Sequence, residues 1–262
     1  MTIAETGSEM TRRAATAEPA TVEAIKSGIP RAGEALLALA ALLIFSPVIG
    51  MAALAVALSS RGPVLFRQRR VGRGGREFLL YKLRTMRVDT AASAGPQVTA
   101  RDDERVTGVG KFLRRTKLDE LPELWNVFKG DMSLIGPRPE VPRYVDLSNP
   151  HWRLVLEARP GLTDPVTLRL RQEEVLLARV EGDREQFYLK TLQPFKLRGY
   201  LEYLRSRSWR TDVKVLWQTC RAVMSHGGAA DPLTISELED LLAVAESKRD
   251  REGDKRREAA SQ

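Results

Sequence analysis

One stretch of the sequence constrains the fold more than any other, because residues 35–58 carry no charged side chain. It reads ALLALAALLIFSPVIGMAALAVAL, which is long enough to cross a lipid bilayer as a helix. Ser46-Pro47 interrupts it near the middle. Proline removes a backbone hydrogen bond and bends a helix, and a serine hydroxyl can bond to a freed carbonyl. The sequence therefore predicts a membrane helix that is bent or broken at Ser46-Pro47.

The charges beside this helix bear on its topology, since cytoplasmic flanks of membrane segments are rich in Lys and Arg. Basic residues stand on both sides: four precede the helix between residues 12 and 31, and six arginines follow between residues 61 and 76. A re-entrant helix with both ends in the cytoplasm would need this pattern. Flanking charge favours that topology only weakly. On the residues alone, spanning and re-entrant helices are about equally open.

The pattern divides the 262 residues into four segments. Residues 1–33 are predicted to be a disordered tail and residues 34–60 the membrane helix. Residues 61–230 are predicted to form one compact domain, and residues 231–262 a last helix with a charged tail. The expected fold class is α+β and mainly helical.

Charge and metal-ligand content limit the classes of function. The formal net charge of +8 indicates an anionic partner, which leaves nucleic acid, an anionic membrane surface and phosphorylated substrates open. Cys220 is the only cysteine, and His151 and His226 are the only histidines. A Cys/His zinc site is therefore improbable, and a hard cation bound by oxygen atoms is the expected metal.

A short β-hairpin is predicted directly after the membrane helix. Apolar runs at 64–66 and 78–81 are rich in strand-forming residues and are joined by the glycine-rich segment 72–75. Lys82 and Arg84 leave the second strand as alternate residues on one face, so they are candidate binding residues. A basic helix is expected at 110–115.

The stretch 116–140, TKLDELPELWNVFKGDMSLIGPRPE, places two adjacent carboxylates before an apolar helix. Leu121, Leu124, Trp125 and Phe128 have helical spacing, while Gly130 is expected to end the helix. Asp119 and Glu120 then lie at the helix start, where free N–H groups favour anions. Two interpretations follow: a helix cap, or a catalytic carboxylate pair beside a phosphate site.

Downstream, the sequence predicts mainly helices. Residues 158–165 are expected to form an extended turn, because two prolines and a glycine resist helix. The amphipathic helix near its end has two interpretations for its tryptophan-bearing face, which can pack in the core or lie at a membrane interface, and the core is favoured. The predicted helices cover residues 150–157, 173–180, 185–205 with a bend at Pro194, 209–224 and 233–251.

Taken together, these features indicate membrane-associated phosphate chemistry. A carboxylate can attack phosphorus and form an acyl phosphate, as in aspartyl-phosphate enzymes. A second carboxylate can hold Mg²⁺, which offsets charge on phosphate oxygens. Arginine side chains supply bidentate phosphate contacts.

The chain resembles the bacterial sugar transferase family, the membrane-anchored phosphoglycosyl transferases that begin assembly of surface polysaccharides. The resemblance covers roughly residues 34–225. Its strongest blocks are GPVLFRQRRVGRGGREFLLYKLRTM, TGVGKFLRRTKLDELPELWNVFKGDMSLIGPRPE and RPGLTD. With a single apolar segment, the chain looks like the minimal catalytic form, and the resemblance implies amphipathic interface helices around a cytoplasmic catalytic domain.

The resemblance implies transfer of a sugar 1-phosphate from a UDP-sugar donor to undecaprenyl phosphate, with release of UMP. It implies that Asp119 is the nucleophile of a covalent phosphosugar intermediate and that Glu120 binds Mg²⁺. The family's membrane helix is re-entrant and broken at a Ser-Pro pair, matching Ser46 and Pro47. The family places such proteins at the bacterial inner membrane, with contacts to membrane lipids. Donor-binding positions are matched by Arg114, Pro137, Arg138 and Pro139.

One departure from the family pattern bears on the donor. Many members have a glycine after the PGLT sequence, where this chain has Asp164-Pro165. The departure predicts a subgroup with different donor contacts.

Two other classes of function fit the sequence less well than an enzyme does. A non-catalytic membrane scaffold would leave the carboxylate pair and the Pro-Arg-Pro loop without a purpose. A nucleic-acid-binding protein would show aromatic RNA-binding motifs or zinc spacing, and neither is present. No nucleic-acid partner is therefore expected, while a homodimer stays open.

Overall fold

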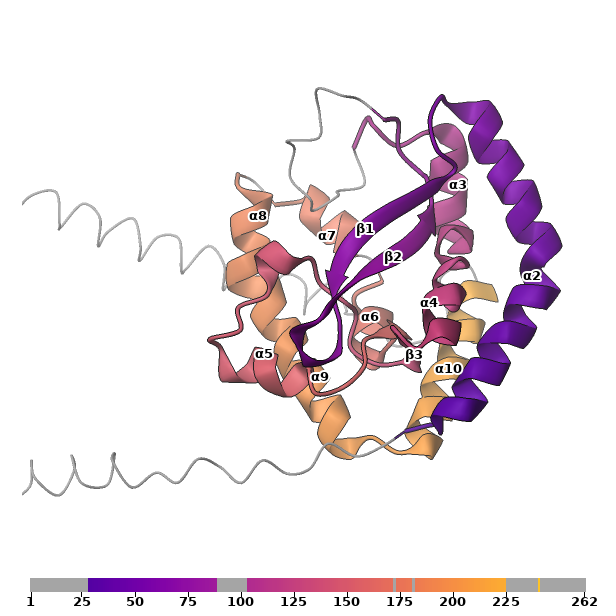
Figure 1. Ribbon diagram of the computed structural model, residues 1–262. Helices are drawn as coiled ribbons and strands as arrows, with labels where there is room; N and C mark the ends of the chain where they lie inside the picture. Colours follow the sequence, from indigo (N-terminus) through magenta and orange to yellow (C-terminus); the bar gives the residue numbers. More distant parts are fainter. Residues whose placement is uncertain (1–27, 89–102, 172, 181, 225–239, 241–262) are drawn as a thin grey trace, which may run out of the picture.

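The computed structural model describes residues 28–88, 103–171, 173–180, 182–224 and Asp240. Figure 1 shows a mainly helical protein with a small two-stranded sheet, which confirms the α+β fold class in its coarse form. The predicted tail up to residue 27, most of the loop 89–108 and the helix from Leu233 lie outside the described residues. The division into four segments stays a prediction.

The apolar stretch forms α2, a single helix over Arg31–Ser59 with Pro47 inside it. Figure 1 shows α2 bending midway, so that it curves around one side of the molecule. The Ser46 hydroxyl donates to the carbonyl of Leu43 at 2.8 Å, which is the bond predicted for a repaired proline bend. Within the described residues α2 is the one helix long and apolar enough to cross a membrane, and only 11% of its most apolar window is buried.

The predicted hairpin is confirmed. Strand β1 (Leu65–Val71) pairs antiparallel with β2 (Glu77–Leu83), with Gln68 opposite Leu80. The turn needs its glycines, because Gly74 and Gly75 have φ angles of 67° and 77°, in the left-handed region.

Two short helices flank the carboxylate pair. Helix α3 (Gly108–Thr116) begins at Thr107, whose side chain accepts the N–H of Gly110, and the 3-10 turn η2 (Leu118–Glu120) follows it. Helix α4 (Glu123–Lys129) ends at Gly130, as predicted. Asn126 is fully buried and joins α4 to β2, since it accepts from the Tyr81 N–H and donates to the Leu79 carbonyl. The hairpin and the carboxylate pair are therefore held in one unit.

The predicted apolar stripe of α4 lies only partly in the core. Leu124 is buried, but Trp125 is exposed, and Asn126 and Val127 occupy the core face instead. Leu121 and Phe128, the other two residues of the stripe, are partly buried and pack against the same core as Leu124.

A second pair of strands was not predicted. Strand β3 (Ser133–Ile135) pairs in parallel with β4 (Gly161–Thr163). Strand β4 lies within residues 158–165, the segment predicted as an extended turn. A side chain on Gly161 would meet the backbone of Gly136 at 2.1 Å, so two glycines let these segments approach. Pro165 then opens helix α6 (Pro165–Arg169), because a proline is tolerated in the first turn.

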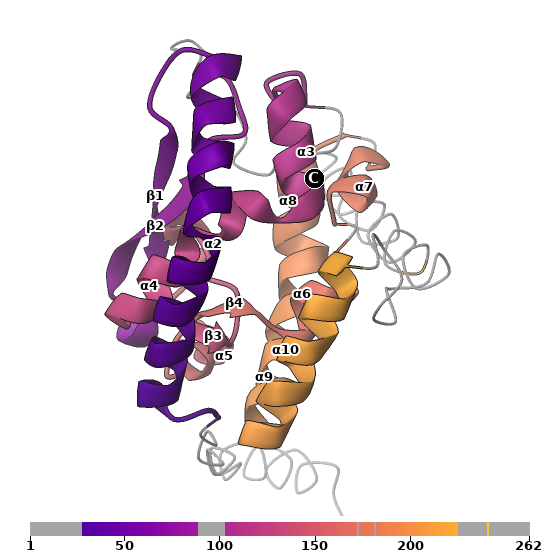
Figure 2. The same cartoon turned by 90° about the vertical axis from the view of Figure 1, so that its right-hand side faces the viewer.

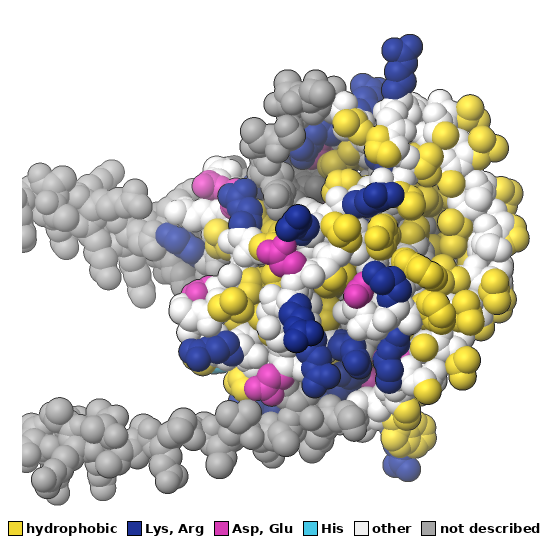
Figure 3. Space-filling view, viewed as in Figure 1, with side chains coloured by type: hydrophobic (Ala, Val, Ile, Leu, Met, Phe, Trp, Pro, Cys, Tyr) yellow, Lys and Arg dark blue, Asp and Glu magenta, His cyan; other side chains and the backbone are white. Residues whose placement is uncertain are grey.

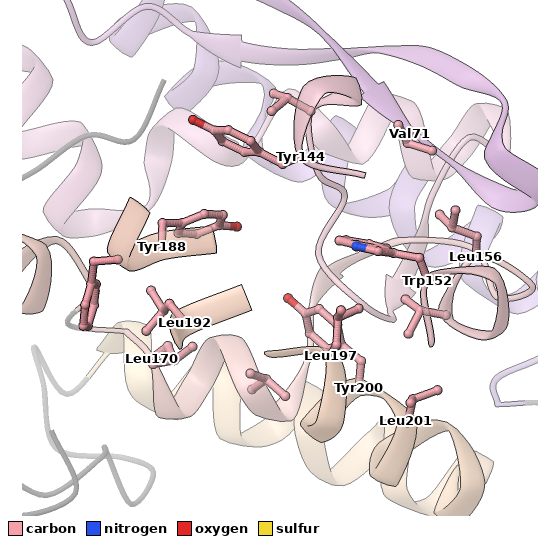
Figure 4. Close-up of a cluster of buried hydrophobic side chains, with 14 of the residues drawn as sticks. Val71, Tyr144, Trp152, Leu156, Leu170, Tyr188, Leu192, Leu197, Tyr200 and Leu201 are labelled. Carbon is pink, nitrogen blue, oxygen red and sulfur yellow. The ribbon is translucent and has the colours of Figure 1, made fainter. Parts of the chain in front are cut away.

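The remaining helices enclose the main apolar core. They are α5 (Pro150–Val155), α7 (Glu173–Ala178), α8 (Arg184–Phe187) and α9 (Gln193–Ser206), and a 3-10 turn, η3 (Pro142–Tyr144), precedes them. Between α8 and α9 the chain makes a π-helical turn, η4 (Tyr188–Leu192), where a bend at Pro194 was predicted. Figure 4 shows Trp152, Leu192, Leu197 and Tyr200 within this core.

Helix α10 (Trp209–Met224) has the predicted bounds, but the prediction that its tryptophan face packs in the core is wrong. Trp209 and Trp217 are 57% and 58% exposed, whereas Asp212 and Val215 are buried. Figure 2 shows α10 and α2 together on the side of the molecule that faces the viewer. Figure 3 shows hydrophobic side chains gathered over α2 and basic side chains over the adjacent hairpin.

Buried polar contacts fix both ends of α2 to the rest of the protein. Near the start, Glu34 accepts the Leu134 N–H and the Ser133 hydroxyl, each at 3.2 Å. Arg31 donates to the carbonyls of Val127 and Phe128 at the end of α4. At the other end, the following segment is bound by Arg84, which donates to the carbonyls of Ser60 and Pro63 at 2.6 Å.

Candidate active site

The site begins with a left-handed residue. Lys117 has φ 58° and is the only non-glycine residue with positive φ in the described chain. It ends α3 and turns the chain into η2, so that Asp119 points inward and is only 7% exposed. A lysine in this conformation is strained, and such strain is typical of functional sites.

Glu120 is surrounded by cationic side chains. Its Oε1 atom lies 2.6 Å from Arg138, 2.9 Å from Lys82 and 3.8 Å from Lys117. Burial alone would raise the pKa of Glu120, but the charges of Arg138, Lys117 and Lys82 outweigh burial and hold that pKa well below its usual range. Glu120 is therefore ionised at neutral pH.

Asp119 has a contrasting environment although it is the adjacent residue. Its buried Oδ1 atom has no hydrogen-bond partner among the described residues. Burial raises the pKa of Asp119, and the neighbouring charge of Glu120 raises it further, against weaker opposing effects of Lys82 and Lys117. A carboxylate with a raised pKa and an unpartnered oxygen is more basic and more nucleophilic than an ordinary aspartate.

A third carboxylate, which the sequence interpretation missed, completes the cluster. Glu123 is 1% exposed and its Oε1 lies 3.1 Å from the Lys82 ammonium. Burial raises the pKa of Glu123, while Lys82 opposes the shift. Lys82 thus bridges Glu120 and Glu123. The sequence predicted Lys82 only as a candidate binding residue. No local pattern shows how β2 lies against α4, so its contacts with Glu120 and Glu123 could not be predicted.

The structure separates the other predicted binding residues. Arg138 and Pro139 lie on the wall of the same cleft as Asp119, whereas Pro137 is buried and its carbonyl accepts the Gly161 N–H. Arg114 also lines the cleft, with Nε bonded to Thr85 and an ion pair to Glu174 at 3.3 Å. Arg84 also lines the cleft, and its guanidinium donates to the carbonyl groups of Ser60 and Pro63.

These residues line a cleft of about 2380 Å³. Its wall includes Phe45 from the middle of α2, next to the Ser46-Pro47 pair, together with Thr219 and Val223 of α10. Asp119 and the membrane-type helix therefore open on one continuous space. The sequence did not predict that Asp119 and α2 line the same cleft.

A magnesium ion is compatible with the oxygen donors of the pair. Within the described part of the chain the ion pairs of Glu120 all reach Oε1, so Oε2 is the oxygen that can bind a cation. Asp119 offers its unpartnered Oδ1. No cluster of three or more His, Cys, Asp or Glu side chains suited to a metal occurs among the described residues. Mg²⁺ needs only one or two carboxylates when substrate phosphates supply other ligands, so the residues fit.

The departure at Asp164 has a structural explanation. The side chain is fully buried, and its Oδ1 accepts the N–H groups of Val166 and Thr167 at 2.7 and 2.9 Å. Asp164 therefore caps α6 and is turned away from the cleft. The predicted change in donor contacts has no direct support from its position.

A family model described as bacterial sugar transferase matches residues 25–226. The chain belongs to the bacterial sugar transferase family. The match covers the dyad of Asp119 and Glu120, the hairpin and α10.

Individual members are about a third or more identical to this chain over the aligned residues. A UDP-glucose:undecaprenyl-phosphate glucose-1-phosphate transferase of Caulobacter vibrioides is 39% identical over 191 residues, covering 71% of this chain and 66% of the relative. A UDP-N-acetylgalactosamine-undecaprenyl-phosphate N-acetylgalactosaminephosphotransferase of Aeromonas hydrophila is 35% identical over 204 residues, covering 77% and 45%. A glucose-1-phosphate transferase of Escherichia coli is 37% identical over 198 residues, covering 73% and 39%.

The chain therefore spans two thirds or less of the length of these relatives. Their names specify different sugars, glucose in two cases and N-acetylgalactosamine in the third. Membership in the family accordingly does not define the sugar that this chain handles.

Proposed function

We propose that this protein transfers a sugar 1-phosphate from a UDP-sugar to undecaprenyl phosphate and releases UMP, as the first step in assembly of a surface polysaccharide or glycan. The observation that supports this best is the cleft. It combines a buried carboxylate with an unpartnered oxygen, a set of cationic side chains, and the middle of the membrane-type helix. The family and the names of its members support the same reaction.

In the first step a carboxylate oxygen of Asp119 attacks the phosphorus that carries the sugar. The bond from that phosphorus to the oxygen bridging the two phosphates breaks, and UMP leaves with the electron pair. The sugar phosphate is then held as an acyl phosphate on Asp119. Lys82, Lys117 and Arg138 lie around Glu120 and favour the negative charge of the donor phosphates.

In the second step an oxygen of undecaprenyl phosphate attacks the same phosphorus. The acyl phosphate bond breaks and returns the carboxylate of Asp119, so the product is undecaprenyl diphosphate sugar. The atoms balance without an external oxidant or reductant. Asp119 must be ionised at the start of each cycle, and its raised pKa makes it a stronger nucleophile once ionised.

Magnesium fits the proposal as the cofactor, held by Glu120 through Oε2. Bound there, Mg²⁺ would offset the negative charge that develops on the leaving group. Arg138 and Lys82 hold Oε1 of Glu120 and so orient the carboxylate.

The membrane arrangement belongs to the same proposal. We place α2 in the inner membrane as a re-entrant helix, with both termini and the catalytic domain on the cytoplasmic side. The midway bend of α2 and its exposed apolar surface support this placement. The exposed tryptophans of α10 suit the lipid interface, where amphipathic rings gather.

A direct transfer assay tests the function. The purified protein in detergent or nanodiscs is incubated with Mg²⁺, undecaprenyl phosphate and a panel of UDP-sugars, and both UMP and the lipid product are measured. We expect UMP release that requires undecaprenyl phosphate for repeated turnover. UMP release without lipid product, or no turnover of any UDP-sugar, would overturn the proposal.

A further inference from the structure

A second group of polar side chains lines the same cleft. The Tyr188 hydroxyl donates to Glu140, and the Lys196 ammonium lies 3.4 Å from that hydroxyl and 2.9 Å from Glu173. Arg70 lies 3.9 Å from Glu140. Glu140, Tyr188 and Lys196 are 8%, 4% and 6% exposed, and all three lie on the cleft wall.

This group lies close to the dyad along the backbone. Arg138 contacts Glu120, the carbonyl of Pro139 accepts from Arg70 at 2.9 Å, and Glu140 accepts from Tyr188. Since consecutive Cα atoms are 3.8 Å apart, the Cα atoms of Arg138 and Glu140 are at most about 7.6 Å apart. Asp119, Arg138 and Glu140 all line the same cleft, so a donor bound at Asp119 occupies a space that also contains Glu140.

The two ends of the cleft differ in charge. The dyad end has cations directed at Glu120, which suits phosphate. At the other end Arg70 and Lys196 are balanced by Glu140 and Glu173, so the end is neutral overall. A neutral group of carboxylates, a phenol and an ammonium disfavours a phosphate but can both accept from and donate to hydroxyl groups.

A defect in the helix brings two of these side chains together. Residues eight apart on a regular helix point about 80° away from one another. The π turn Tyr188–Leu192 absorbs one residue, so Lys196 is placed almost in line with Tyr188, at 4.7 Å from its ring centre. Tyr188 also packs on Tyr144 with ring centres 5.4 Å apart (Figure 4). The π turn thus orients a polar pair toward the cleft.

Stability alone does not account for this arrangement. Buried ion pairs contribute little compared with apolar side chains of the same shape, because removing charges from water is costly. Tyr188 belongs to the main apolar core, so apolar neighbours are at hand for such replacements. The polar group is therefore best explained by a ligand.

We propose that Glu140, Tyr188 and Lys196 bind the hydroxyl groups of the donor's sugar and determine which UDP-sugar is used. The inference rests on the proposed function and adds a sugar subsite to it. The nucleotide lies elsewhere in the cleft. Glu140 accepts from a sugar hydroxyl, and Lys196 donates to another.

The experiment compares wild type with Glu140→Gln and Tyr188→Phe, two substitutions that keep the shape of the side chain. The ratio of kcat/KM between the best and the next-best UDP-sugar is measured with UDP-glucose, UDP-galactose and their N-acetylamino counterparts. A ratio does not depend on the fraction of folded enzyme. Glu185→Gln is the matched control, because Glu185 is a carboxylate outside the cleft wall that pairs with Arg143.

We expect kcat/KM for the preferred sugar to fall about 10- to 100-fold in Glu140→Gln, and the ratio to shrink, because unpaired polar groups penalise the correct sugar most. Inhibition by UMP should be unchanged. An unchanged ratio would overturn the subsite, as would an equal loss for every sugar together with weaker UMP inhibition. Wild type that turns over no UDP-sugar overturns the proposed function itself, whereas turnover with unchanged selectivity overturns only this inference.

Discussion

Two groups of buried carboxylates in this protein are satisfied differently: those around the start of α2, which we call the anchor region, and those of the dyad region around Asp119. In the anchor region, both oxygens of Asp212 are bound by Tyr203 and Arg207, and the Ile29 N–H adds a further bond. Glu34, at the start of α2, also has a partner for each oxygen. The same holds for Asp164, which caps α6. In the dyad region Asp119 keeps an oxygen without a partner.

This difference distinguishes carboxylates that stabilise the fold from carboxylates that we propose take part in the reaction. A buried oxygen without a partner costs stability, so a protein retains it only where another need outweighs the cost. The anchor carboxylates join α2 to the rest of the fold and should govern stability. The dyad carboxylates should govern activity. Substitutions in the two regions should therefore give opposite results.

The largest effect is expected for Asp119→Asn. If Asp119 is the nucleophile, its removal should lower the rate of UMP release by about 10⁴-fold or more, because the amide cannot form the acyl phosphate. The melting temperature should not fall, since the amide carries no charge to bury. Asp146→Asn, at an exposed carboxylate outside the cleft wall, is the control. Full activity in Asp119→Asn would refute the role of Asp119.

Asp212→Ala, in the anchor region, should have the opposite effect to Asp119→Asn: the protein should lose stability but keep its activity. Arg207 would be left buried without its carboxylate, and the free energy of unfolding should fall by about 3–5 kcal/mol. Denaturant unfolding in detergent measures this loss. Activity per folded molecule should stay close to wild type. A selective loss of kcat with normal stability would contradict the claim that the anchor carboxylates govern stability.

A smaller effect is expected for Glu120→Gln. The amide keeps the shape but weakens both metal binding and the ion pairs to Arg138 and Lys82, so activity should fall about 10²-fold. Higher Mg²⁺ should recover part of the loss. Glu202→Gln, at an exposed position on α9, controls for loss of charge. An unchanged Mg²⁺ dependence would argue against ligation by Glu120.

The smallest effect concerns pH. Since burial raises the pKa of folded Asp119 above 3.8, the folded protein binds this proton more tightly than the unfolded chain does. The resulting stabilisation is present below pH 3.8 and is lost as the pH rises through the raised pKa. In metal-free buffer the melting temperature of Asp119→Asn, relative to wild type, should therefore rise between pH 4 and pH 8. A margin that shrinks over this range would show that the pKa is lowered.

Local patterns in the sequence predicted much of this fold. The charge-free stretch gave α2, the alternating runs around Gly74 gave the hairpin, and helical spacing gave the bounds of α10. Adjacent carboxylates near a helix start were predicted because caps and turns depend on few residues. These features require no knowledge of distant contacts.

The features that complete the site depend on distant contacts and were not predictable. Strands β3 and β4 have three residues each and are 25 residues apart in sequence, so neither shows a strand pattern. Lys117 adopts a conformation usual for glycine. Glu123, Glu140 and Tyr188 become site residues only through packing. The face of α10 was misassigned because an apolar stripe looks the same whether it contacts a core or a membrane.

The covalent intermediate on Asp119 is the central claim, and mass spectrometry of the intact protein tests it most directly. The protein is incubated with Mg²⁺ and its best UDP-sugar in the absence of undecaprenyl phosphate, then digested for peptide mapping. The account predicts the added mass of one sugar phosphate on the peptide that contains Asp119, its disappearance when undecaprenyl phosphate is added, and no addition in Asp119→Asn. Addition to a different residue, or lipid product formed at the wild-type rate by Asp119→Asn, would contradict it.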